Sequence, residues 1–108
     1  MAMIEVNEQS ISAELDAAFE KGQVVILKFG SEWCDSCHAL ESELEDLDED
    51  NENISVFLVD TDEAAELAGI YSVRALPTML IYKTRDNLVY RGEGVLLAQD
   101  IEALCQEA

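Results

Sequence analysis

An apolar run followed almost at once by two cysteines three residues apart is the feature that most constrains the fold of this chain. Residues 24–29 read Val-Val-Ile-Leu-Lys-Phe, which is typical of a central strand buried on both faces of an α/β sheet. The segment Trp33-Cys34-Asp35-Ser36-Cys37 then opens a predicted helix. One helical turn brings both sulfurs to the same helix end. The sequence therefore predicts a cysteine pair at the junction of a buried strand and a helix.

That junction favours a particular chemistry. The first turn of a helix leaves backbone N–H groups without partners, and the positive end of the helix dipole stabilises a thiolate there. A Cys-x-x-Cys segment near a βαβ pattern is typical of a redox motif rather than of a structural bridge. Cys34 and Cys37 are therefore candidates for a redox disulfide, whose chemistry needs no metal and no organic cofactor.

Length and charge limit the possible domain organisation and the classes of binding partner. The 108 residues fit a single domain, 1–108, and a hydrophobic content of 49% favours a folded globular chain. The net charge is −18, which makes nucleic acid and anionic membranes poor partners. This negative charge indicates either a solvated acidic surface or a surface that attracts basic partner proteins. No secretory signal and no membrane span is recognised, so we expect a cytoplasmic monomer.

Hydrophobic periodicity predicts alternating strands and helices. Strands are expected over residues 3–6, 24–29, 54–59, 79–83 and 88–91, the last one broken by Gly92 and Gly94. Helices are expected over about 11–21, 34–50, 63–70 and 97–106. In the second helix an apolar stripe faces inward, and the acids, Asp48 among them, form a solvated face. The order βαβαβαββα calls for a layered α/β sheet that ends in an antiparallel hairpin.

Three separated segments together resemble the thioredoxin family over nearly the whole chain. Residues 29–37 look like the family's redox segment, and residues 71–78, Tyr-Ser-Val-Arg-Ala-Leu-Pro-Thr, are similar to the stretch that carries its cis-proline. Gly94 stands where the family has a glycine near the active site. The resemblance implies a thioredoxin fold, with three α/β/α layers around a central mixed β-sheet.

The resemblance also implies a substrate-binding surface beside the two sulfurs. Pro77 should form a cis bond with Leu76 and face the cysteines. The backbone of Leu76 would then pair with an incoming peptide, strand to strand. Trp33 would shield the site and offer a flat apolar contact, with simple packing as the alternative role. Gly94 would lie close by.

By the same resemblance, the expected activity is that of a protein-disulfide reductase. Cys34, at the helix N-terminus and more exposed, would attack a disulfide in a client protein and form a mixed disulfide. Cys37, one turn further on, would attack Cys34 and release the reduced client. A thioredoxin-reductase-like, flavin-dependent donor would then recycle the cysteine pair.

Lys28 is the sharpest departure from the family pattern. It stands where the family usually has a buried aspartate that moves protons for the second cysteine, and Leu58 is near the position of the accompanying lysine. Because Lys28 shares a strand face with Val24 and Ile26, its stem should be buried. It either stabilises the Cys37 thiolate, serves as its general base, or extends to water without a catalytic role.

Other departures surround the cysteines. Asp35-Ser36 replaces the usual Gly-Pro; the acid opposes ionisation of Cys34, whereas the hydroxyl can stabilise a thiolate. Gly30 replaces a tryptophan and should open one wall of the site. His38 is either an exposed helix residue or a source of positive charge. An acidic rim should disfavour acidic clients; it comprises Glu32, Asp35, Asp60, Asp62 and Glu93.

Three other functions stay open from the sequence. A disulfide oxidant or isomerase would use the same cysteines in an oxidising compartment. A scaffold or binding module would keep the fold with little turnover. Cys34 to His38 also forms a Cys-x-x-Cys-His pattern, which occurs in c-type haem attachment, although its βαβ context disfavours that function. Cys105 either packs in the core as a small apolar residue or acts as a regulatory thiol.

Overall fold

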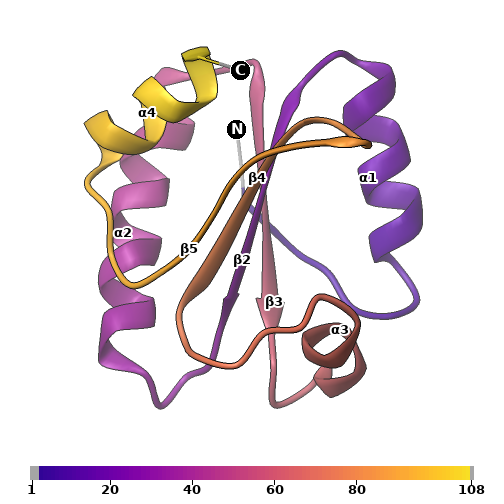
Figure 1. Cartoon of the computed structure of the whole chain (residues 1–108), viewed down its shortest axis with the longest axis vertical. Coiled ribbons are helices and arrows are strands. Elements are labelled where there is room, and N and C mark those ends of the chain that lie inside the picture. The colour runs from indigo at the N-terminus through magenta and orange to yellow at the C-terminus, as the bar shows by residue number, and fades with distance from the viewer. Residues whose placement is uncertain (1–2, 108) are drawn as a thin grey trace.

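Strands and helices follow one another in the predicted order in a computed structural model that describes residues 3–107. The strands are β1 (Ile4–Glu5), β2 (Val24–Gly30), β3 (Ile54–Asp60), β4 (Thr78–Thr84) and β5 (Asn87–Glu93). The helices are α1 (Ile11–Glu20), α2 (Asp35–Asp50), α3 (Ala65–Ile70) and α4 (Ala98–Glu107). Figure 1 shows α2 and α4 on one side of the sheet and α1 and α3 on the other. The predicted α/β/α layers are therefore confirmed.

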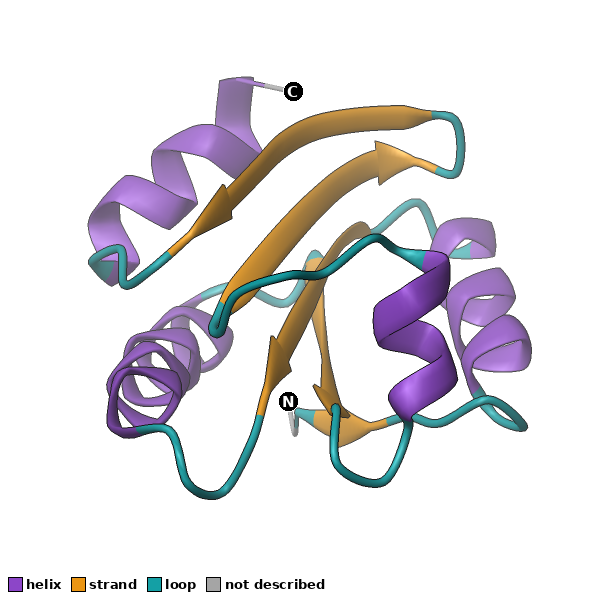
Figure 2. Cartoon of the chain, turned by 60° about the horizontal axis from the view of Figure 1, so that its bottom comes forward, coloured by secondary structure: helices purple, strands orange, loops and turns teal. Residues whose placement is uncertain are grey.

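The sheet is mixed, with the strand order β1-β3-β2-β4-β5. β2 lies at its centre, parallel to β3 and antiparallel to β4, and all seven of its residues are buried. The hairpin of β4 and β5 forms one edge of the sheet and leads into α4 (Figure 2). The apolar run in the sequence is thus the central strand that its composition predicts.

Successive side chains of β2 point to opposite faces of the sheet, so they divide the core into two parts. Val25, Leu27 and Phe29 face the side covered by α1 and α3, whereas Val24 and Ile26 pack with the buried stripes of α2 and α4. The predicted stripes are confirmed: Ile11, Leu15 and Ala18 of α1 are buried, as are Cys37, Leu40, Leu44 and Leu47 of α2. No helix within residues 3–107 is long and apolar enough to cross a membrane.

The prediction that Gly92 breaks the last strand is wrong. β5 continues through Gly92, which pairs in register with Met79. A β-carbon at this glycine would overlap the Tyr90 hydroxyl, so the tyrosine ring covers the glycine backbone. Gly92 therefore provides space for a neighbouring side chain. The strand ends before Gly94, whose φ of +90° suits glycine.

Asp48 also departs from its predicted place on the solvated face of α2. It is 5% exposed. Because it follows the core residue Leu44 by one helical turn, it lies beside the inward stripe rather than opposite it. An acidic residue type alone does not reveal such a position.

Candidate redox site

The two cysteines occupy the start of α2, directly after the loop that follows β2. Cys34 is the N-cap residue, and its sulfur accepts a hydrogen bond from the Cys37 backbone N–H over 3.1 Å. The Ser36 hydroxyl lies 3.4 Å from the same sulfur. The helix terminus therefore presents donors to Cys34, which is the environment in which a thiolate is stabilised.

Cys34 and Cys37 form a disulfide, with their α-carbons 5.2 Å apart. Cys37 is completely buried, whereas Cys34 is partly exposed. An incoming disulfide can therefore reach Cys34 but not Cys37. The more exposed sulfur belongs to Cys34, the residue that the family resemblance implies as the attacking thiol.

The loop before the cysteines is held by short-range hydrogen bonds. The Trp33 N–H donates to the Ser31 hydroxyl over 3.3 Å, and a His38 ring nitrogen lies 2.9 Å from the Glu32 carbonyl oxygen. His38 therefore connects the first turn of α2 to the loop. Trp33 is 87% exposed, so it does not pack in the core, and its ring is available for contact with another molecule.

Sheet register brings the other predicted segments to the same end of the molecule. Phe29, just before the end of β2, pairs with Thr78, and Thr78 pairs with Glu93 on its other side. Pro77 and Gly94 are the next residues outward, and the Gly94 N–H donates to the Pro77 carbonyl over 3.0 Å. The bond between Leu76 and Pro77 is cis.

Arg91, for which the sequence predicts no role, supports this segment. Its guanidinium donates to the carbonyls of Tyr71 and Ser72, each over 2.8 Å. Ser72 has a φ of +57°, a left-handed conformation that is uncommon outside glycine. Arg91 thus holds the turn that precedes the proline segment. A single arginine in a strand gives no sequence signal for such a contact.

Lys28 is only 5% exposed, and its tip lies beside Gly30, which Cys37 also approaches. Its ammonium is 3.6 Å from a carboxylate oxygen of Glu41, which lies one helical turn after Cys37. It borders a hollow of about 180 Å³, whose lining also includes Gly30 and Leu58. The Lys28 tip fills the space next to the Gly30 α-carbon, so Gly30 accommodates the lysine. The i+4 spacing indicates that Glu41 lies on the helix face of Cys37, but the sequence does not indicate its pairing with Lys28.

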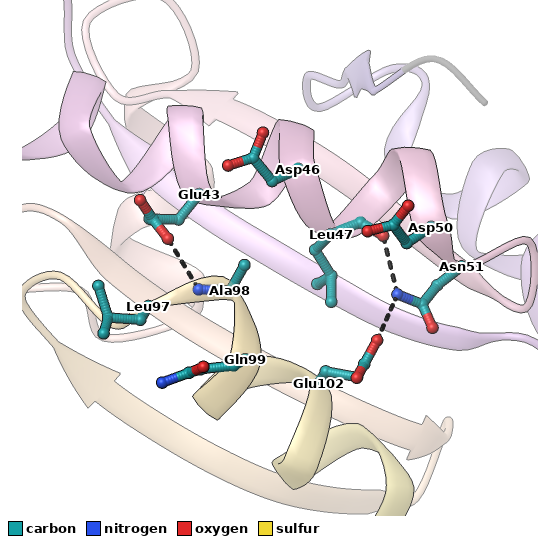
Figure 3. Close-up of a pocket in the computed structure, with 9 residues that line it drawn as sticks. All are labelled: Glu43, Asp46, Leu47, Asp50, Asn51, Leu97, Ala98, Gln99 and Glu102. Atoms are coloured by element: carbon teal, nitrogen blue, oxygen red, sulfur yellow. Dashed lines mark hydrogen bonds between the residues drawn. The ribbon is translucent and has the colours of Figure 1, made fainter.

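Two further features of the structure involve acidic side chains. A groove of about 420 Å³ separates the later turns of α2 from α4 (Figure 3). Glu43 accepts a hydrogen bond from the Ala98 N–H across it, and the Asn51 amide donates to both Leu47 and Glu102. These contacts fasten α4 to α2. Among residues 3–107, one group of acids has oxygens within 4.8 Å of one another; it comprises Glu5, Asp60 and Glu63.

Cys105 packs inside the core between the sheet and the helices, as the apolar interpretation of this residue predicts. It is 6% exposed. Burial, together with the nearby Glu102 carboxylate, raises the pKa of its thiol to about 11. A thiol that stays protonated at neutral pH is a poor nucleophile, so Cys105 is not expected to compete with the site cysteines.

Alkaline pH should therefore destabilise the protein partly through Cys105. The thiol has an ordinary pKa of 9.0 in the unfolded chain and about 11 when folded. Its contribution to stability is complete below pH 9 and is lost as the pH rises toward 11, because the unfolded state releases its proton first. Burial raises the pKa values of Tyr71 and Tyr82 in the same direction.

Urea unfolding of the oxidised protein at several pH values between 8 and 11 measures this effect. A Cys105→Ala variant should lose stability less steeply with pH, while the tyrosine contribution remains. Equal slopes in the two proteins would show that Cys105 ionises alike in the folded and unfolded states.

The fold and this site define a class: an α/β protein whose helix-capping cysteine pair cycles between dithiol and disulfide. The thioredoxin family model matches residues 3–107. Thioredoxin from Bacillus subtilis is 34% identical over 84 residues, which cover 77% of this chain and 76% of that protein. The chain therefore belongs to the thioredoxin family, and it is a thiol–disulfide oxidoreductase of the disulfide-reductase type.

Solved structures agree with this assignment. Chloroplastic thioredoxin z superposes with a TM-score of 0.84 at 26% identity, over 98% of this chain and 94% of that one. A mutant thioredoxin from Halobacterium salinarum gives a TM-score of 0.80 at 28% identity, over 99% and 94%. The predicted thioredoxin fold is thereby confirmed along essentially the whole chain.

Proposed function

We propose that this protein acts as a cytoplasmic reductant of disulfides in client proteins, with Cys34 as the attacking thiol and Cys37 as the resolving thiol. The observation that carries the assignment of roles is the contrast in exposure, since Cys34 is partly exposed and Cys37 is fully buried. The Cys34 sulfur also accepts a hydrogen bond from the Cys37 backbone N–H at the helix terminus. Attack by an accessible, stabilised thiolate starts the exchange.

A thioredoxin-reductase-like flavoprotein is the electron donor in this proposal. The protein itself carries neither metal nor organic cofactor in the cycle, because the two thiols hold both electrons. It works as a monomer and does not engage nucleic acid or membranes, in keeping with its net charge of −18.

Clients would dock around Trp33 and along Leu76 and Pro77, with Gly94 at the border of the surface. The exposed indole offers apolar contact area. In this proposal, the backbone of Leu76 pairs with an extended client segment, strand to strand. Since Glu32, Asp35 and Glu93 are exposed nearby, clients with neutral or basic surroundings are favoured over acidic ones.

The reduction potential of the Cys34–Cys37 pair tests the direction of this chemistry. The protein, as a Cys105→Ala variant so that only the site thiols are counted, is equilibrated with glutathione buffers and analysed by mass spectrometry. A potential near −270 mV, about that of thioredoxin, is expected for a reductant. A value above about −200 mV would indicate an oxidant or isomerase instead.

A further inference from the structure

Near Cys37, which is completely buried, Lys28 forms an ion pair with Glu41. The Lys28 side chain is 7% exposed, and its ammonium is 3.6 Å from Glu41, whose side chain is 32% exposed. Lys28 pairs in the sheet with Leu58 and Met79. An apolar side chain could pack among these neighbours without any cost of burying charge. Buried ion pairs are seldom more stabilising than apolar replacements, so stability alone is a weak reason for a lysine here.

The ammonium and Cys37 both lie beside Gly30. A β-carbon built on Gly30 would lie 2.9 Å from the Lys28 nitrogen and 3.1 Å from the Cys37 β-carbon. The charged nitrogen and the cysteine therefore border the same point, which the Lys28 tip fills because Gly30 has no side chain. A β-carbon at position 30 would force the Lys28 tip to shift from this place.

Glu41 connects this buried charge to solvent. It is on α2, one turn after Cys37, and it borders the hollow of about 180 Å³ together with Lys28. The other titratable side chains that face this hollow are Glu5 from β1, Glu32 from the loop after β2, His38 from α2 and Asp60 from β3. Among the acids that border the hollow, Glu41 is the one that the structure pairs with Lys28.

We propose that Lys28 and Glu41 serve the resolving step: Lys28 stabilises the Cys37 thiolate, and Glu41 accepts the proton that Cys37 gives up. This inference rests on the proposed function, in which Cys37 resolves the mixed disulfide. The S–H bond of Cys37 breaks and Glu41 takes the proton, while the Lys28 ammonium keeps its charge near the thiolate. Glu41 then releases the proton to solvent.

The step balances in atoms and electrons. The Cys37 thiolate attacks the Cys34 sulfur, the bond between the two cysteines forms, and the bond from Cys34 to the client sulfur breaks. The client sulfur leaves with the electron pair and takes a proton from solvent. The two site thiols are oxidised, and the client disulfide is reduced by two electrons.

The aromatic disulfide DTNB separates the two cysteines in a stopped-flow experiment. Attack by Cys34 releases one thionitrobenzoate at a rate that rises with DTNB concentration. Resolution by Cys37 releases the second at a rate independent of that concentration. All proteins carry Cys105→Ala, and the second phase is recorded across neutral and mildly alkaline pH.

Lys28→Met should leave the first phase within about two-fold of its original rate, because Cys34 is stabilised by the helix terminus. The second phase should slow about three- to ten-fold near pH 7, and its pH profile should move to higher pH. The rate of the second phase should fall by a smaller factor than the fraction of Cys37 present as thiolate, since a more basic thiolate is also more nucleophilic. An unchanged second phase would overturn the role of Lys28.

Glu41→Gln tests the second half of the proposal. Its second phase should slow although its pH profile moves to lower pH, because the ammonium is no longer neutralised and the proton acceptor is gone. A second phase as fast as in the parent would overturn the role of Glu41. Glu45→Gln, an exposed acid one turn further along α2, is the matched control and should change neither phase. A parent protein that releases no second thionitrobenzoate would instead refute the proposed roles of the cysteines.

Discussion

Cys37→Ser should convert the protein from a catalyst into a trap for its clients. Cys34 remains able to attack, since it is the exposed member of the pair and keeps the N–H of residue 37 as a donor. The mixed disulfide cannot then be resolved, because a serine hydroxyl does not displace a thiol from sulfur. Turnover should fall to the uncatalysed rate, while a covalent adduct with the client accumulates.

Insulin reduction driven by NADPH and a thioredoxin reductase measures the turnover, and non-reducing electrophoresis measures the adduct. Cys34→Ser should abolish both signals, because Cys37 is completely buried. Cys105→Ala should retain both. Adducts that form through Cys37 in the Cys34→Ser variant would show that the two roles are reversed. A parent protein that the reductase does not recycle would support a scaffold rather than a reductant.

Local patterns predict the elements that position the site. The apolar run of β2 and the helix start at Cys34 depend on neighbouring residues, so periodicity and end signals suffice to locate them. The convergence of Pro77 and Gly94 on the end of β2 follows from a sheet register that the family resemblance implies. The structure confirms the expected cis bond at Leu76.

Tertiary contacts account for what the sequence leaves out. The pair of Lys28 with Glu41 depends on how α2 packs against β2, which no window along the chain contains. Within β5, the Tyr90 ring covers Gly92, and this glycine stays part of a strand that composition alone would end. Lys28 and Gly30 are related in the same way within β2. These two contacts depend on side-chain conformations, which residue types alone do not reveal.

Phe29→Ala should produce the largest loss of stability among single core changes near the site. Phe29 is completely buried, and its ring centroid lies 5.4 Å from that of Tyr71, with the two planes inclined by 52°. Truncation removes this aromatic contact and leaves a cavity between β2 and the α3 side of the core. Changes of this kind cost about 3–5 kcal/mol. The free energy of unfolding of a domain of this size is about 5–15 kcal/mol in total, so a large share of the stability would be lost.

Urea unfolding of the oxidised parent and variant measures this difference in the free energy of unfolding. The slope of that free energy against urea concentration should be the same in both proteins. Phe19→Ala is the matched control, because Phe19 is of the same type but only partly buried against the same core, and it should cost clearly less. A loss below about 1 kcal/mol at Phe29 would mean that the core closes around the missing ring. If the core closed in this way, the end of β2 would move, and the cysteines that follow it would move as well. We would then expect slower disulfide reduction by the folded variant. A destabilised variant that keeps its activity while folded would show that Phe29 supports the core without fixing the position of the cysteines.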